Sequence, residues 1–325
     1  MRVAVTGATG LIGTKLVQAL LARGDGVTVL SRDPERARAR LERSRSASMQ
    51  APQPPSAPLD VPAGSLETAG WDPLAEAAPK AALAGTDAVV HLAGENVAQR
   101  WTAAAKRSIR ESRVQGTSHL VQGLEALVED ERPRVLVSGS AIGYYGAHGD
   151  EPIDEEASAG SDFLAQTCAA WELEAQKPER LGVRVVRVRT GVVLSREGGA
   201  LGKMLPPFKL GVGGPVAGGR QYISWIHTDD VVGIVLAAID GEEWRGAINA
   251  TAPDPQRNRD FSKALGLVLH RPALLPIPGA ALQLLYGEMA EIVTGGARVL
   301  PAKALVLGYE FRYPELGGAL RAALS

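Results

Sequence analysis

The sequence of 325 residues contains a single cysteine, Cys168. One cysteine excludes an internal disulfide and any metal site built from several thiolates. No histidine lies near it in the sequence, the nearest on its N-terminal side being His148. We therefore expect Cys168 to be a small, buried apolar residue rather than a ligand or a nucleophile.

An excess of charge of either sign is also absent, because 35 basic residues balance 36 acidic ones and leave a net charge of −1. This balance argues against nucleic acid or an acidic membrane as a dedicated partner. No apolar run reaches about 18 residues, the length that a membrane span needs. The N-terminus has no signal-peptide profile. We expect a cytoplasmic protein that acts on a small molecule, and a hydrophobic content of 45% is ample for its core.

The chain begins with a short apolar run at residues 3–5 that leads into three glycines, Gly7, Gly10 and Gly13. An apolar stripe at helical spacing follows from Leu11 onward. This order of strand, glycine turn and helix is typical of dinucleotide-binding proteins, in which the first two glycines allow a sharp turn close to the diphosphate and the third allows close helix packing. The free amides of the helix N-terminus then face the anion.

The second apolar run, residues 27–30, ends at Ser31 and Arg32. An acidic residue at this point would bind the ribose 2′-hydroxyl of NAD, whereas an arginine pairs with the 2′-phosphate of NADP. Asp33 competes for the first role, but Pro34 after it favours a helix cap. The sequence predicts NADP as the cofactor, with NAD less favoured.

Further strands and helices alternate along most of the chain, which predicts an α/β fold with a Rossmann-type doubly wound parallel sheet. Strands are expected at 86–94, 134–140 and 183–189, and helices at 34–43, 102–127 and 163–176. The strand at 183–189 alternates apolar and basic residues, which predicts a half-exposed face or a place near the sheet edge. Ligands bind beyond the carboxyl ends of such strands, so residues 7–13, 31–32, 91–95 and 138–145 should converge on one cleft.

Two segments depart from this alternation. Residues 44–64 are rich in Ser, Ala, Pro and Gln, which predicts a flexible insertion. Beyond residue 194 repeated glycines indicate a smaller lobe that covers the substrate. We expect a dinucleotide-binding domain at 1–220 and a C-terminal lobe at 221–325, with a module of unknown role at about 272–320.

Four motifs resemble those of the short-chain dehydrogenase/reductase superfamily, in its extended and atypical branch that includes nucleotide-sugar epimerases. They are the glycine turn at 6–13, His-Leu-Ala-Gly at 91–94, Ser-Gly-Ser at 138–140 with Tyr-Tyr-Gly at 144–146, and Trp-Ile-His-Thr-Asp-Asp at 225–230. The chain is most similar to the bacterial YfcH-type epimerase family proteins, and the resemblance covers nearly its whole length except 44–64. It implies an oxidoreductase or epimerase acting on a small polar substrate or a nucleotide sugar.

The superfamily's Tyr-x-x-x-Lys pair is missing, because no tyrosine of this chain has a lysine four residues later. In that pair the lysine lowers the pKa of the tyrosine, which exchanges a proton with the substrate oxygen. Ser140 matches the superfamily's serine, and Tyr144 or Tyr145 could supply the phenol. The alternative role of Ser140 is structural, with its hydroxyl forming a hydrogen bond at the end of the strand. The alternative for either tyrosine is a ring that packs against the nicotinamide or the loop.

The resemblance and the glycine turn together give a candidate cofactor site. Its residues lie at the ends of four expected strands: Gly7, Ala8, Thr9, Gly10, Leu11, Ile12, Gly13, Ser31, Arg32, Leu92, Ala93, Gly94, Glu95 and Ser138. His227 with Asp229 and Asp230 could suggest a metal, but Thr228 or Asp229 as a helix cap explains them better, and we expect no metal site. The competing hypothesis to an enzyme is a catalytically silent NADP-binding regulator or scaffold, which the missing Tyr-x-x-x-Lys pair favours.

Overall fold

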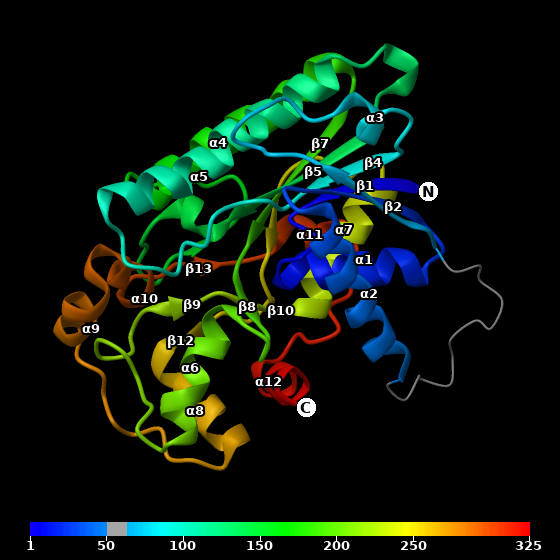
Figure 1. The fold of residues 1–325 in the computed structure, drawn as a ribbon. Helices are drawn as coiled ribbons and strands as arrows, with labels where there is room; N and C mark the ends of the chain where they lie inside the picture. The colour runs from blue at the N-terminus through cyan, green and yellow to red at the C-terminus, as the bar shows by residue number, and fades with distance from the viewer. Residues whose placement is uncertain (51–63) are drawn as a thin grey trace.

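The apolar runs of the sequence form one parallel sheet of seven strands in the computed structural model, which describes residues 1–50 and 64–325 (Figure 1). The strand order is β3-β2-β1-β4-β5-β7-β11, and every neighbouring pair runs parallel. The strands are β1 (Arg2–Thr6), β2 (Gly26–Ser31), β3 (Leu66–Gly70), β4 (Ala88–His91), β5 (Val135–Ala141), β7 (Arg184–Thr190) and β11 (Gly246–Ala250). The order reverses direction between β1 and β4, the position where such sheets bind dinucleotides. The expected doubly wound architecture is confirmed.

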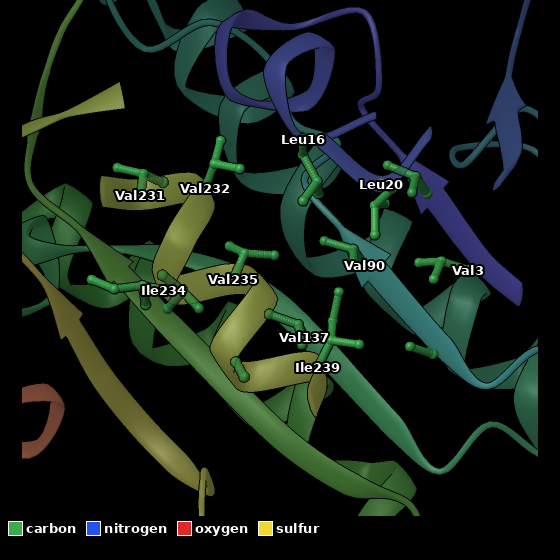
Figure 2. Packing of buried hydrophobic residues seen from close by; sticks show 14 of the residues in the cluster. Val3, Leu16, Leu20, Val90, Val137, Val231, Val232, Ile234, Val235 and Ile239 are labelled. Atoms are coloured by element: carbon green, nitrogen blue, oxygen red, sulfur yellow. The ribbon is translucent and has the colours of Figure 1, made fainter. Parts of the chain in front are cut away.

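Helices cover both faces of this sheet (Figure 1). One face packs against α1 (Leu11–Ala22), α2 (Pro34–Gln50) and α7 (Thr228–Asp240); the other packs against α3 (Lys80–Leu83), α4 (Ala103–Glu125) and α5 (Phe163–Gln176). Figure 2 shows Leu16 and Leu20 of α1 and Val235 of α7 meeting Val90 and Val137 of the sheet. Each such side chain contributes about 1.5–3 kcal/mol when it is fully buried. This packing fixes α1 against the sheet.

A smaller region continues from the carboxyl side of the sheet and has its own apolar cluster. Its helices are α6 (Gly199–Lys209), α8 (Asn258–Leu269), α9 (Gly279–Tyr286), α10 (Glu291–Thr294) and α12 (Leu316–Leu324). Helix α11 (Ala302–Val306) packs instead on the main sheet beside β11, where Ala304 joins the sheet core. The short strand pairs of the smaller region are β8 (Val192–Leu194) with β10 (Trp225–His227), β9 (Tyr222–Ile223) with β12 (Gln256–Arg257), and β6 (Pro152–Ile153) with β13 (Arg298–Val299). In Figure 1, α12 at the end of the chain lies beside α8 and α6.

The structure differs from the expected domain layout at residue 220. Both α7 and β11 lie beyond that position, yet α7 packs on the sheet and β11 pairs with β7. The insertion expected at 44–64 begins as helix, because α2 continues to Gln50. Residues 51–63 of that insertion lie outside the described residues. No helix among the described residues is long and apolar enough to cross a membrane.

Of the two alternatives for β7, a half-exposed face or a place near the sheet edge, the structure shows the second, because β7 lies next to the edge strand β11. The half-exposed face is not found at two of its arginines. Arg184 and Arg189 are both buried, with 8% and 3% of their surface exposed. The guanidinium of Arg184 donates to the carbonyl oxygens of Ala238 at 2.7 Å, Ile239 at 3.0 Å and Trp244 at 2.8 Å. Two of these carbonyls belong to the last turn of α7, where a cation satisfies free acceptors and complements the helix dipole.

Candidate functional site

The three glycines at the end of β1 have separate roles. Gly7 has φ +69°, and a Cβ there would lie 2.5 Å from the Leu92 carbonyl carbon. Gly10 caps the N-terminus of α1, and its amide donates to the Gly7 carbonyl at 3.0 Å. A Cβ at Gly13 would lie 2.2 Å from the same carbonyl oxygen. The sequence therefore folds into a bare turn with α1 amides behind it, which fits a dinucleotide diphosphate.

At the end of β2, Arg32 is exposed and makes no hydrogen bond or ion pair with residues 1–50 or 64–325. Asp33 instead accepts a 3.0 Å hydrogen bond from the Arg36 amide through its carboxylate. This bond makes Asp33 the cap of α2, the alternative role foreseen for it. Ser31 accepts from the Asp33 amide at 3.2 Å, which fixes the turn. The Arg32 guanidinium is the free cation of this turn.

A buried histidine joins the ends of β1 and β4. The two ring nitrogens of His91 lie 2.7 Å from the Thr6 hydroxyl and 3.0 Å from that of Thr117 on α4. Complete burial lowers the pKa of His91 to about 4, so the ring is neutral at pH 7. Thr6 also accepts from the Ala93 amide at 3.3 Å. These bonds hold Leu92 and Ala93 against the glycine turn.

The segment after β4 is anchored to helix α4. The Glu95 amide donates to the Ser112 hydroxyl at 2.9 Å, and the Glu95 carbonyl accepts from the Arg113 guanidinium at 3.0 Å. A Cβ at Gly94 would lie 3.2 Å from the carbon of that guanidinium. The predicted residues 92–95 thus lie at the carboxyl end of β4, next to the glycine turn.

The serines of β5 are buried beside α5. Ser138 is fully buried and its hydroxyl donates to the Gly139 carbonyl at 3.2 Å. Ser140 is 5% exposed and donates a 2.7 Å hydrogen bond to the Glu172 carboxylate. The Ser140 proton is therefore engaged, while its oxygen can still accept a hydrogen bond.

The two candidate tyrosines differ in their surroundings, although both lie in the 3-10 turn η2 (Ile142–Tyr145). Tyr145 is fully buried; its hydroxyl donates to Asn249 at 2.7 Å and accepts from Arg189 at 2.9 Å. Burial raises the pKa of Tyr145 to about 12, against the opposing effect of Arg189. This environment favours a structural role for Tyr145.

Tyr144 is half-buried, and its ring lies 3.5 Å from the carbon of the Arg189 guanidinium, measured to the ring centroid. Its hydroxyl makes no hydrogen bond within the described part of the chain. The cation–π contact fixes the ring while the phenol stays available. Of the two tyrosines, Tyr144 is therefore the one whose hydroxyl has no protein partner among the described residues.

Sequence reasoning missed the ion pair at the centre of this cluster. Arg189 donates to both carboxylate oxygens of Glu172, at 2.8 and 2.9 Å, and Arg187 reaches the same carboxylate at 3.1 Å. The available signals were the basic alternation along β7 and the two glutamates in the second half of α5, Glu172 and Glu174. Their pairing depends on tertiary contacts between β7 and α5.

The motif at 225–230 contacts the C-terminal module through Asp230. The N-cap of α7 is His227, which accepts from the Asp229 amide at 3.2 Å, so the expected caps Thr228 and Asp229 are wrong. Asp230 is 1% exposed and accepts from the amides of Arg312 at 2.7 Å and Tyr313 at 3.1 Å. Residues 1–50 and 64–325 contain no cluster of histidine, cysteine and carboxylates that could hold a metal ion.

Comparison with known proteins agrees with this geometry. Residues 3–249 match the model of the NAD dependent epimerase/dehydratase family, and residues 277–323 match a domain of unknown function, DUF1731. A chloroplastic epimerase family protein of Arabidopsis thaliana, an SDR39U1 homologue, is 40% identical over 324 residues, which are 100% of this chain and 87% of the relative. The Bacillus subtilis epimerase family protein YfhF is 34% identical over 322 residues, which cover 98% and 97% of the two chains.

Among solved structures, the human epimerase family protein SDR39U1 (isoform 2) with NADPH superposes with a TM-score of 0.82 at 34% identity, covering 99% of both chains. A Bacillus cereus UDP-glucuronic acid 4-epimerase superposes with a TM-score of 0.75 at 18% identity, covering 99% of this chain and 98% of the other, which shows a shared fold. The chain therefore belongs to the NAD dependent epimerase/dehydratase family and carries a DUF1731 module at its C-terminal end.

Proposed function

We propose that the protein binds NADP(H) and uses it in an oxidoreductase or epimerase reaction on a small polar substrate or a nucleotide sugar. The observation that carries the cofactor proposal is the bare glycine turn of residues 7–13 followed by the free guanidinium of Arg32 at the end of β2. An arginine here pairs with a 2′-phosphate, which NAD lacks. The human relative with NADPH supports the same cofactor.

The proposed cofactor residues fall into three groups by position. Residues 7–13 hold the diphosphate through backbone amides, and Ser31 and Arg32 hold the adenosine end. Residues 92–95 lie at the end of β4, and the fully buried Ser138 supports the end of β5 from within the sheet. The glycines at 7 and 13 leave the space that side chains would fill. Bound NADPH supplies a hydride.

For the chemical step we propose Tyr144 as the proton donor to the substrate oxygen. Its hydroxyl is unbound by the described protein, and its ring is held against Arg189. Ser140 accepts a hydrogen bond from a substrate hydroxyl and so orients it, because its own proton is held by Glu172. Tyr145 supports this arrangement by fixing Arg189 and Asn249 rather than by exchanging a proton.

A second candidate function is an NADP-binding regulator or scaffold without turnover. Two observations favour it: no tyrosine has a lysine four residues later, and the Ser140 and Tyr145 hydroxyls are both occupied by protein partners. The two candidates share the cofactor and differ in whether substrate reacts.

The test has two stages on the purified protein. Calorimetric titration with NADPH and NADH should show tighter binding of NADPH, and failure to bind either would refute the cofactor proposal. The NADPH-loaded protein is then screened against small carbonyl compounds and nucleotide sugars by loss of nicotinamide absorbance and by product stereochemistry. Turnover that Tyr144→Phe abolishes supports the enzyme, and tight binding without turnover across the panel supports the regulator.

A further inference from the structure

One cation at the carboxyl end of β4 and β5 has no carboxylate partner. Arg113 is a residue of α4, and its guanidinium lies against Gly94 in the segment that follows β4. The same group lies 5.3 Å from the ring centroid of Trp171, whose own ring edge packs on Gly139 of β5. The guanidinium therefore lies where the ends of β4 and β5 meet.

The hydrogen bonds of Arg113 leave most of its donors free. One terminal nitrogen, Nη1, donates to the carbonyls of Glu95 at 3.0 Å and Ile109 at 3.1 Å. Guanidinium has five N–H donors, and the other three make no hydrogen bond within residues 1–50 and 64–325. Burial lowers the pKa of Arg113, and Cys168 and Glu95 offset part of this effect. A half-buried cation with free donors is costly unless a ligand satisfies it.

The neighbouring arginines of β7 differ from Arg113 because each has a carboxylate partner. Arg187 and Arg189 are both paired with Glu172. Helix α5 adds no cation, since Phe163–Gln176 contains neither lysine nor arginine. Arg113 thus combines free donors, the lack of a carboxylate partner and a position between the ends of β4 and β5.

The sheet order says which part of a dinucleotide would meet these donors. Arg32 lies at the end of β2 and the glycine turn at the end of β1, with β4 and β5 on the other side of the turn. A dinucleotide laid across the switch point, with its phosphorylated adenosine at β2 and its diphosphate at β1, extends its second nucleotide toward β4 and β5. The second nucleotide of NADP is the nicotinamide half.

We propose that Arg113 is the cofactor-binding cation for the nicotinamide half, where its free N–H groups donate hydrogen bonds to the hydroxyls of the nicotinamide ribose. This inference rests on the proposed function, because it requires a bound dinucleotide. A planar guanidinium with two adjacent donors suits the two vicinal hydroxyls of a ribose. Arg113 also donates a hydrogen bond to the Glu95 carbonyl, so the same side chain would hold both the ribose and the segment after β4.

The experiment measures a series of adenine ligands by calorimetry on Arg113→Met and Arg113→Lys, with wild type beside them. Adenosine 2′,5′-bisphosphate contains the adenosine end with the first phosphate of the diphosphate, 2′-phospho-ADP adds the second phosphate, and 2′-phospho-ADP-ribose adds the second ribose. Arg110→Met is the matched control, since Arg110 is an exposed arginine on the same helix. Thermal melting of each variant shows that it is folded.

Arg113→Met should leave the first two ligands within about twofold of wild type and weaken 2′-phospho-ADP-ribose and NADPH by about 10- to 100-fold, the size expected for hydrogen bonds from a charged group. Arg113→Lys should recover part of this loss, and Arg110→Met should change nothing. Equal loss with 2′-phospho-ADP would place the guanidinium on the diphosphate and overturn the proposal, as would no loss with any ligand. If wild type binds none of the series, the proposed function fails first; if wild type binds and the variants match it, only the role of Arg113 fails.

Discussion

Glu172 and Arg189 form a bidentate ion pair between α5 and β7, and each of the two side chains is 4% exposed. The pair contacts all three candidate catalytic residues, because Ser140 donates to Glu172 and both tyrosines contact Arg189. The proposed site therefore depends on a buried charge network that the sequence motifs do not contain.

Glu172→Gln should lower the free energy of unfolding by about 3–5 kcal/mol, because it leaves buried Arg189 without its counter-charge. The measurement is urea denaturation followed by circular dichroism. Glu174→Gln is the control on the same helix, since Glu174 pairs with the more exposed Lys177 and should cost under about 1 kcal/mol. Equal losses for the two variants would contradict the importance of the buried pair.

Tyr144→Phe and Tyr145→Phe should separate catalysis from stability. Tyr145→Phe removes a hydroxyl that Asn249 and Arg189 both use, so the free energy of unfolding should fall by about 1–3 kcal/mol. Tyr144→Phe should leave stability nearly unchanged and lower the rate of any turnover by about 10²- to 10⁴-fold. Full activity in Tyr144→Phe would remove its phenol from the mechanism.

Arg32→Asp should reverse the cofactor preference. The carboxylate repels the 2′-phosphate and can accept from a 2′-hydroxyl, so NADPH should bind at least about 10-fold more weakly while NADH gains or keeps affinity. Calorimetry with both nucleotides gives the ratio, and raising the salt concentration should narrow the difference for wild type. Arg40→Asp, an exposed site further along α2, is the control. Unchanged affinities in Arg32→Asp would refute the 2′-phosphate assignment.

Because of His91, the free energy of unfolding should decrease as the pH is lowered below about 6.5. Its folded pKa of about 4 lies below the ordinary histidine value of 6.5, so between these values the unfolded state binds more protons than the folded state. The stability from this group is fully present above pH 6.5 and falls by about 3 kcal/mol as pH drops to 4. Denaturation of wild type and His91→Gln at several pH values should show a shallower slope in the variant. His270→Asn, at an exposed position, should keep the wild-type slope.

The sequence was sufficient where a local pattern decides the structure. The strand, turn and helix at residues 2–22 follow from an apolar run, three glycines and a helical stripe, and α5 matches its expected range. The edge strands β3 and β11 were not expected. β3, with the sequence Leu-Glu-Thr-Ala-Gly, has little apolar character and pairs with β2 alone. Its strand conformation depends on that pairing.

In the candidate site, too, local motifs were predictable from the sequence, whereas features that depend on tertiary contacts were not. The motifs located Ser140, Tyr144 and Tyr145 at the end of β5. The two tyrosines are adjacent in one 3-10 turn, yet their side chains lie in different surroundings. The sequence alone therefore does not show which of the two hydroxyls lacks a protein partner. The basic alternation of β7 predicted a half-exposed face or a place near the sheet edge, and the strand does lie next to the edge strand β11. It did not predict a buried arginine, because lone arginines are seldom buried. Arg189 is buried because Glu172, from a different element, neutralises it.

Asp230→Asn tests how the C-terminal module is held on the sheet domain. The buried Asp230 carboxylate accepts from two backbone amides, at Arg312 and Tyr313, and lies 3.3 Å from the Tyr309 hydroxyl. An asparagine keeps one oxygen and turns an NH2 group toward a donor, which should cost about 1–3 kcal/mol locally.

Because residues 309–313 lead into α12, amide hydrogen exchange across residues 309–324 should quicken by at least about 10-fold in Asp230→Asn, while exchange in β1, β4 and β5 stays slow. Asp229→Asn, in the same turn of α7 but partly exposed, should leave the exchange pattern unchanged. If NADPH affinity is also unchanged in Asp230→Asn, the module serves stability rather than cofactor binding. Uniformly faster exchange through the sheet would instead show that the module and the sheet unfold as one unit, and that Asp230 stabilises the whole chain.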